Sequence, residues 1–284
     1  MMAVANTVGL WPRNITFYSP TAAPHNLGKP FCFRSRRQNC NTNSVDVYPS
    51  KISDRVLMDI QNSGIIACLR AQSAEVAIEA ARAAFRGGIS VLEVTMSTPG
   101  VFEVLECLVQ EYPALSIGVG TVLDRENAKV ALRLGAKFLM SPAMVKGILD
   151  DVTEYQALYI PGATTPTEIL SASNAGARIV KVYPVSALGG VEYMAAVKKP
   201  FPHIPMVASQ GITLDSVCQY ISSGAMSVVL SDAIFNKRAM FQRDFVLVNQ
   251  LATIAAFTAK EAIRYKKKRV NYGRPRGKEK QGIT

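Results

Sequence analysis

Short apolar runs rich in β-branched residues alternate with amphipathic stretches from about residue 65 onward. The runs recur about every 20 to 25 residues, which is the pattern of repeated strand–helix units. The amphipathic stretches have helical periodicity, and several end at a glycine before the next run. The eight apolar runs cover residues 65–69, 91–95, 116–122, 138–141, 158–161, 179–183, 205–208 and 227–230. Eight parallel strands, each followed by a helix, predict an α/β fold of the TIM (β/α)8 barrel class.

An open, doubly wound sheet is the alternative architecture for this alternation. Its usual dinucleotide fingerprint, Gly-x-Gly-x-x-Gly, would follow the first strand. Residues 70–75 read RAQSAE instead. We therefore favour the barrel.

The barrel is expected to occupy residues 46–260, between two extensions. Residues 1–45 contain five Lys or Arg and no acid, together with many hydroxylated residues. This composition predicts a transit peptide without fixed structure, with an ordinary disordered tail as the alternative. The stretch is not strongly Arg-amphipathic, so we expect import into the chloroplast (plastid stroma) rather than the mitochondrion.

Residues 261–284 are expected to form a basic C-terminal tail, in which residues 265–269 are the frayed end of a helix that runs into the tail. The formal net charge of the chain is +11, and residues 260–284 contain ten Lys or Arg against two Glu. Such a charge would attract nucleic acid or an anionic membrane surface. No aromatic platform or folded binding motif accompanies it, so we favour a solvated tail, with contact to nucleic acid as the less favoured alternative.

The cysteines and histidines limit the chemistry of the barrel. No Cys-x-x-Cys pair occurs among the cysteines, so we expect reduced and mostly buried thiols. The five cysteines are Cys32, Cys40, Cys68, Cys107 and Cys218. The two histidines, His25 and His203, cannot build a histidine-based zinc or iron site in the barrel. No apolar run reaches the roughly 18 residues of a membrane span.

Lys181 and Glu93 are the candidate catalytic residues, because each carries a charge within an apolar strand. Burial disfavours the charged form of an amine and frees its lone pair to attack a carbonyl. The alternative for Lys181 is a stem on apolar surface with its head in solvent. Glu93 would serve as the proton shuttle that such chemistry needs, or as a structural partner that neutralises the lysine.

Six short motifs occur here in the order and spacing found in a known enzyme family. They are residues 92–95 (LEVT), 118–122 (GVGTV), 141–142 (SP), 160–162 (IPG), 165–168 (TPTE) and 181–184 (KVYP). The chain thus resembles the class I aldolases for 2-keto-3-deoxy-6-phosphogluconate (KDPG) and 4-hydroxy-2-oxoglutarate (KHG). The resemblance covers roughly residues 53–260. Any single motif is weak evidence for the family, but six motifs in the same order and spacing are specific to it.

The resemblance implies a retro-aldol cleavage that gives pyruvate and an aldehyde, without a metal or other cofactor, in a homotrimer. Lys181 would form an imine with the 2-oxo group of the small-molecule substrate, and Glu93 would move protons. Arg70 and Thr121 would bind the carboxylate or other polar groups of the substrate. An alternative for Thr121 is a cap on the helix that begins near residue 124.

Three further positions in the family-like motifs and turns complete the set of candidate substrate-binding residues. They are Pro161, Ser209 and Gly211.

Three positions depart from the pattern of this family. Ser97 stands where many members carry an arginine that binds the pyruvyl carboxylate. Gln210 and Asp232 occupy turns that usually present glycine N–H groups to a phosphate. A phosphorylated substrate is therefore less favoured than an unphosphorylated 2-oxo acid.

Two hypotheses follow from these residues. Lys181 and Glu93 favour a Schiff-base aldolase, whereas Ser97, Gln210 and Asp232 favour a catalytically weakened barrel that serves as a binding or scaffold protein in the plastid. Trapping of pyruvate on the protein would distinguish the two.

Overall fold

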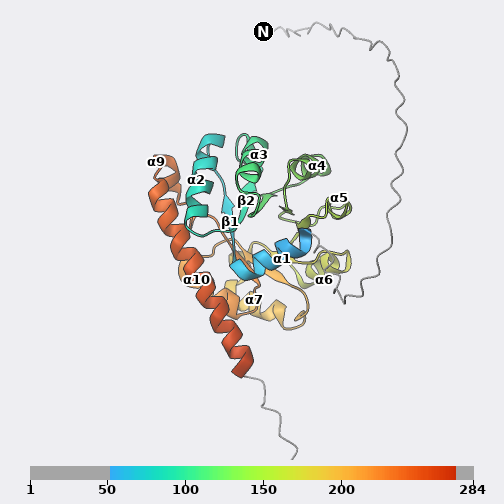
Figure 1. Cartoon of the computed structure of the whole chain (residues 1–284). Helices are drawn as coiled ribbons and strands as arrows, with labels where there is room; N and C mark the ends of the chain where they lie inside the picture. The colour runs from blue at the N-terminus through green and yellow to red at the C-terminus, as the bar shows by residue number, and fades with distance from the viewer. Residues whose placement is uncertain (1–51, 273–284) are drawn as a thin grey trace, which may run out of the picture. The chain divides into compact units, whose positions relative to one another are not determined.

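A computed structural model describes residues 52–272, which form a parallel barrel surrounded by helices (Figure 1). The strands are β1 (Ile65–Leu69), β2 (Val91–Thr95), β3 (Ser116–Gly120), β4 (Phe138–Met140), β5 (Leu158–Ile160), β6 (Gly162–Ala163), β7 (Val180–Val182), β8 (Met206–Ser209) and β9 (Ser227–Leu230). The helices are α1 (Ile52–Ser63), α2 (Ala74–Arg86), α3 (Val101–Glu111), α4 (Arg125–Arg133), α5 (Ile148–Glu154), α6 (Pro166–Asn174), α7 (Gly190–Lys198), α8 (Val217–Ser222), α9 (Lys237–Gln242) and α10 (Phe245–Tyr272). Two 3-10 turns, η1 (Val185–Leu188) and η2 (Leu214–Ser216), follow β7 and β8.

The sheet closes on itself, which confirms the barrel and excludes the open sheet. Its order is β5-β4-β3-β2-β1-β9-β8-β7-β6, with parallel pairing throughout. The two end strands, β5 and β6, are consecutive in the chain and separated only by Pro161. The fifth predicted strand is therefore split in two, because a proline has no N–H for the ladder. Its carbonyl still accepts a bond from the backbone N–H of Lys181 at 2.8 Å.

Two apolar clusters separate the inside of the barrel from its outer layer. The outer cluster joins the outward-facing strand residues to the surrounding helices. The inner cluster includes Val56 and Ile60 of α1 together with Phe138 and other inward-facing strand residues. Helix α1 contacts β1, β2, β5 and β9, and Figure 1 shows it crossing the end of the strands. It therefore covers the N-terminal end of the barrel and leaves the opposite end for a site.

Helix α10 corrects the expected boundary of the basic tail. It runs through Tyr272, so residues 261–272 are helical rather than part of a tail. Its buried alanines, such as Ala252 and Ala259, continue a helical apolar face that packs on α2 and α8. The expected transit peptide, residues 1–45, and residues 273–284 lie outside the described residues. None of the helices in residues 52–272 is long and apolar enough to cross a membrane.

Candidate active site

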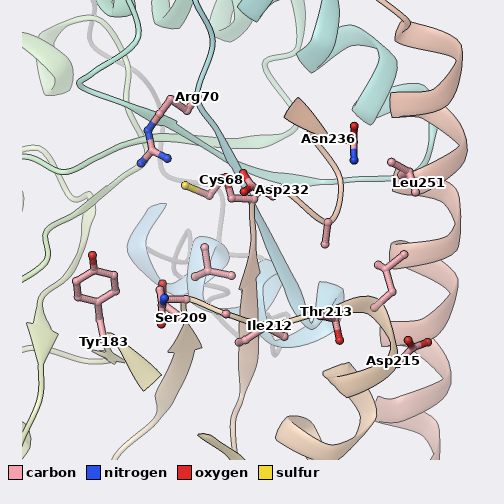
Figure 2. Close-up of a pocket in the computed structure, with 16 residues that line it drawn as sticks. Cys68, Arg70, Tyr183, Ser209, Ile212, Thr213, Asp215, Asp232, Asn236 and Leu251 are labelled. Carbon is pink, nitrogen blue, oxygen red and sulfur yellow. The ribbon is translucent and has the colours of Figure 1, made fainter. Parts of the chain in front are cut away.

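A cavity of about 790 Å³ opens at the C-terminal ends of β1, β8 and β9. Figure 2 shows Arg70 and Tyr183 toward one side of it and Asp215 and Leu251 toward the other. In parallel barrels this end of the strands is where substrates bind. Its lining residues are Cys68, Arg70, Tyr183, Ser209, Gln210, Gly211, Ile212, Thr213, Leu214, Asp215, Val229, Ser231, Asp232, Ala233, Asn236 and Leu251.

Lys181 lies on the interior face of β7. Its strand neighbours Val180 and Val182 belong to the outer apolar cluster, whereas Ile179 belongs to the inner one. Side chains alternate along a strand, so Lys181 faces the interior with Ile179. The residue is 5% exposed, and its Nζ lies 5.2 Å from the ring centroid of Tyr183, a cavity residue.

Glu93 faces the interior from β2 by the same alternation. Leu92 and Val94 point into the outer cluster, and Glu93 is 3% exposed. Its carboxylate lies over Gly120 of β3, where any β-carbon would overlap it. A glycine at this position therefore makes room for the buried carboxylate.

Cys68 is a buried thiol near Glu93, Lys181 and Arg70. Burial raises the pKa of the Cys68 thiol well above its usual value, and the negative charge of Glu93 raises it further. The positive charges of Lys181 and Arg70 act in the opposite direction. The register of β1 and β2 sets Cys68 beside Glu93, and Cys68 lines the cavity together with Arg70 and Tyr183.

Lys181 and Glu93 do not form an ion pair within residues 52–272. A purely structural counter-ion would be expected to pair directly with the buried lysine. The geometry therefore leaves amine and carboxylate as separate groups beside the cavity. The described residues also contain no cluster of three or more His, Cys, Asp or Glu that could hold a metal ion.

Arg70 occupies the neighbourhood of Ser97. Its Nε donates a hydrogen bond to the Ser97 hydroxyl at 3.1 Å, and that hydroxyl lies 3.0 Å from the Thr95 hydroxyl. The register that aligns Cys68 with Glu93 brings these two strand ends together. The guanidinium of Arg70, the residue that follows β1, is thus held beside Ser97, the position at which the family resemblance led us to expect an arginine.

The turns after β8 and β9 carry an acidic rather than a basic character. Asp215 and Asp232 both line the cavity, and Arg70 is the one cationic residue among the lining residues in the described part of the chain. Asp232 is 63% exposed and lies 3.5 Å from Lys237 Nζ. An exposed pair of this kind is largely screened, so the carboxylate keeps much of its charge toward the cavity.

The candidate residues Ser209 and Gly211 also lie on the cavity wall. Ser209 ends β8 and is buried, whereas Gly211 has a φ of +73° and a β-carbon there would collide with Ser186. Gln210 between them has a φ of +86° and accepts a hydrogen bond from the Ser186 hydroxyl. A non-glycine residue at such a φ is strained, so this turn is held in a conformation that glycine would adopt more readily.

Two of the predicted substrate-binding residues lie outside the cavity wall. Pro161 is buried between β5 and β6, where its carbonyl binds the backbone of Lys181. Thr121 follows β3 with a φ of 60°, and Asp124 caps α4 instead by accepting from the N–H of Asn127. The capping alternative for Thr121 is therefore wrong.

Several cavity residues were not predicted from the sequence. Tyr183 could have been found, because it lies two residues after Lys181 and a strand repeats its facing every two residues. Cys68 precedes Arg70 by the same interval. Asp215 and Asn236 carry no comparable signal, since they follow the barrel strands in loops and turns. The expectation of mostly buried thiols is only partly met, because Cys68 is buried, Cys107 intermediate and Cys218 exposed.

Cys68 should resist alkylation in the folded protein. Its raised pKa means that less thiolate is present at a given pH, and thiolate is the reactive form. With iodoacetamide near pH 8, we expect Cys218 to be modified much faster than Cys68, as measured by peptide mass spectrometry. Both should react alike after unfolding. Equal rates in the folded protein would contradict the placement of Cys68 inside the barrel.

The chain matches known proteins along most of its barrel. A model of the family described as "Aldolase: KDPG and KHG aldolase" matches residues 56–251. The 2-dehydro-3-deoxy-phosphogluconate aldolase of Dickeya dadantii (strain 3937) is 30% identical over 187 residues, which cover 65% of this chain and 88% of that protein. The KHG/KDPG aldolase of Escherichia coli (strain K12) is 28% identical over 186 residues, covering 66% of this chain and 87% of that protein.

A solved structure supports the same relationship. The chain resembles the KDPG aldolase of Legionella pneumophila with a TM-score of 0.66 and 26% identity, covering 70% of this chain and 97% of that one. That aldolase was crystallised with pyruvate captured as a covalent carbinolamine intermediate. With a family match across the barrel and a buried lysine beside its mouth, this chain belongs to the KDPG and KHG aldolase family.

Proposed function

We propose that this chain is a class I aldolase that cleaves a 4-hydroxy-2-oxo acid to pyruvate and an aldehyde through an imine on Lys181. The observation that carries the proposal is a lysine and a glutamate buried on the interior wall of the barrel without pairing to each other. The imine nitrogen serves as the electron sink of the reaction, so the mechanism needs no metal. The carbinolamine captured in the Legionella pneumophila aldolase is an intermediate of the same chemistry.

Imine formation begins when the neutral amine of Lys181 attacks C2 of the substrate. The resulting carbinolamine must lose its hydroxyl as water, and that hydroxyl needs a proton. Glu93 supplies the proton as a carboxylic acid and is left as a carboxylate. Its interior placement beside Gly120 keeps it near the mouth of the barrel, where the substrate enters.

Cleavage of the C3–C4 bond then uses the iminium group. Glu93, now a carboxylate, removes the proton from the C4 hydroxyl, and the electron pair of the C3–C4 bond moves into the iminium to give an enamine. The aldehyde departs. Proton transfer to C3 of the enamine regenerates an iminium, whose hydrolysis releases pyruvate and the free amine of Lys181. A carboxyl group that alternates between acid and base serves each of these steps.

Arg70 is the proposed anchor for the C1 carboxylate. A guanidinium binds a carboxylate through two charge-assisted hydrogen bonds, and Arg70 lines the cavity. Its Nε bond to Ser97 restrains the side chain at the position of the missing family arginine. This arrangement offsets the departure at Ser97, because the cation comes from β1 instead of β2.

Substitution of the two buried residues tests the mechanism. We expect Lys181→Met to reduce cleavage to background and Glu93→Gln to slow it about 100-fold or more, as for the loss of a positioned acid–base group. Lys199→Met, which removes an exposed lysine after α7, should leave the rate unchanged. Pyruvate release from KHG and KDPG, followed with a coupled dehydrogenase, provides the measurement.

The outcomes of this experiment separate the two hypotheses. Full activity of Lys181→Met would refute the imine on this residue. Cleavage of neither substrate by the unaltered chain would instead favour the weakened barrel that binds or organises other molecules.

We further propose that the preferred substrate is unphosphorylated, as in 4-hydroxy-2-oxoglutarate. Asp215 and Asp232 line the part of the cavity formed by the β8 and β9 turns, where their charges oppose a phosphate dianion. Gln210 also stands in a turn where a glycine would let a phosphate approach the backbone more closely. These features leave the carboxylate anchor intact and act only on the distal end of the substrate.

Two variants should separate recognition of the two ends. Arg70→Met should raise KM for KHG and KDPG alike by about tenfold or more, because both carry the C1 carboxylate. Asp232→Asn should improve kcat/KM for KDPG by roughly threefold to fivefold, a modest gain for an exposed charge, and leave KHG nearly unchanged. Steady-state kinetics on both substrates provide the test. Faster cleavage of KDPG than KHG by the unaltered chain would overturn the proposed preference.

We propose that the protein assembles as a homotrimer, in line with the family resemblance. Phe241, Val246 and Phe257 on α9 and α10 are large apolar residues that are exposed in the single chain. Apolar surface of this kind is typical of contact between subunits. Light scattering during size-exclusion chromatography should give about three times the 30.8 kDa of the chain. A mass of one chain at micromolar concentration would contradict the trimer.

We propose a plastid location from the composition of residues 1–45, which are basic, hydroxylated and free of acids. A fusion of these residues to a fluorescent protein should accumulate in the chloroplasts of plant cells. The same fluorescent protein without the segment should stay in the cytosol. Accumulation of the fusion in mitochondria or the cytosol would contradict the proposal.

A further inference from the structure

A second cavity lies at the end of the barrel opposite the active site. Its volume is about 640 Å³. Pro205 and Met226, which precede β8 and β9, line it together with Gln61 near the end of α1. These positions belong to the N-terminal ends of the strands, whereas Arg70 and Ser209 lie at the C-terminal ends. The two cavities therefore share no lining residue.

The walls of this cavity carry a cluster of cationic side chains. Lys198 comes from the last turn of α7, and Lys266 and Lys267 come from α10. His203 lies on the turn that leads into β8. The basic segment around residue 266, which was expected to form a solvated tail, thus forms part of a cavity wall.

Lys198 and Lys266 are both half-buried and line the same cavity. Burial lowers the pKa of each amine, and the positive charge of Lys266 lowers that of Lys198 further. Lys198 Nζ donates to the carbonyl of Ile204 at 2.6 Å, and Lys266 Nζ donates to the carbonyl of Ala225 at 3.0 Å. An ammonium has three donors, so each lysine retains two N–H groups for another acceptor.

No carboxylate balances this charge within the described chain. The lining residues include no Asp or Glu, and no ion pair involves Lys198, Lys266 or Lys267. The nearby acid of α10, Glu261, pairs with Arg264 and lines other pockets. Two half-buried cations of like charge are costly to hold together unless an anion joins them.

The backbone is shaped to hold Lys198 in this position. The stem of Lys198 lies against Gly224, where an added β-carbon would come within 2.5 Å of the lysine Cγ. Gly224 also has a φ of +117°, which favours glycine for a second reason. The remaining wall is mainly apolar and includes Pro202, Ile221 and Ile263. The cavity thus combines a cationic corner with an apolar wall.

We propose that this cavity binds a small phosphorylated solute, whose phosphate accepts hydrogen bonds from Lys198 and Lys266. A dianion suits two adjacent ammonium groups better than a single carboxylate does, and lysine binds phosphate as a point charge. The organic part of the solute packs on the prolines and aliphatic side chains. The bound solute would contact α7, α8 and α10 at the end of the barrel opposite the active site. This binding does not depend on aldolase activity.

Calorimetry with pyrophosphate as the probe tests this site. The full chain is titrated with sodium pyrophosphate at constant ionic strength, with sodium chloride as the replacement salt. We expect saturable binding by the unaltered protein. Lys198→Met and Lys266→Met should each weaken it by about tenfold or more. Lys260→Met removes an exposed charge from the same helix outside the cavity and should leave the affinity unchanged.

Two controls make the outcome decisive. Arg70→Met, at the other end of the barrel, should bind pyrophosphate as the unaltered chain does; a loss there would place the anion in the active site and overturn the proposal. Lys266→Gln keeps a hydrogen-bond donor and serves if the methionine variant fails to fold, as judged by circular dichroism. The proposal is also overturned if the unaltered chain shows no saturable binding at millimolar pyrophosphate, or if Lys260→Met weakens binding as much as Lys266→Met.

Discussion

Two charged side chains sit on the interior wall of a closed barrel, and the local structure accommodates the cost of keeping them there. Lys181 and Glu93 are almost fully buried, yet they do not neutralise each other through a direct ion pair. Desolvation of an unpaired charge is expensive unless neighbouring dipoles or a change of protonation relieves it. Gly120 leaves space for the carboxylate, and α1 closes the far end of the barrel. Ionisable side chains that are buried at such a desolvation cost are typical of catalytic sites.

Alternation along the strands explains why the catalytic candidates could be found from the sequence. Lys181 of β7 and the preceding Ile179 face the interior, whereas Val180 and Val182 face outward, so a charge at position 181 stands out against apolar neighbours. The same alternation singles out Glu93 on β2. The spacing of the apolar runs was sufficient to predict the barrel, because each run except the fifth supplies one strand, and Pro161 divides the fifth into β5 and β6.

Features that depend on tertiary contacts could not be predicted from these local sequence patterns. The hydrogen bond between Arg70 and Ser97 joins two strand ends whose register is set by packing of the whole barrel. From the sequence, Arg70 and Ser97 were considered separately, and Ser97 was expected to weaken carboxylate binding. In the structure, the guanidinium of Arg70 lies beside Ser97. The length of α10 was missed for a related reason, since its alanine face becomes meaningful only against α2 and α8. The basic residues around position 266 were interpreted as a frayed helix end before a solvated tail, whereas Lys266 donates a hydrogen bond to the backbone carbonyl of Ala225.

Reductive trapping shows whether Lys181 forms a covalent imine with a 2-oxo acid. The protein is incubated with pyruvate and sodium borohydride, digested, and mapped by mass spectrometry. Reduction converts the imine into a stable secondary amine, so we expect one reduced pyruvyl adduct per chain, on the peptide that contains Lys181. An adduct confined to another lysine, or one that persists undiminished in Lys181→Met, would contradict it.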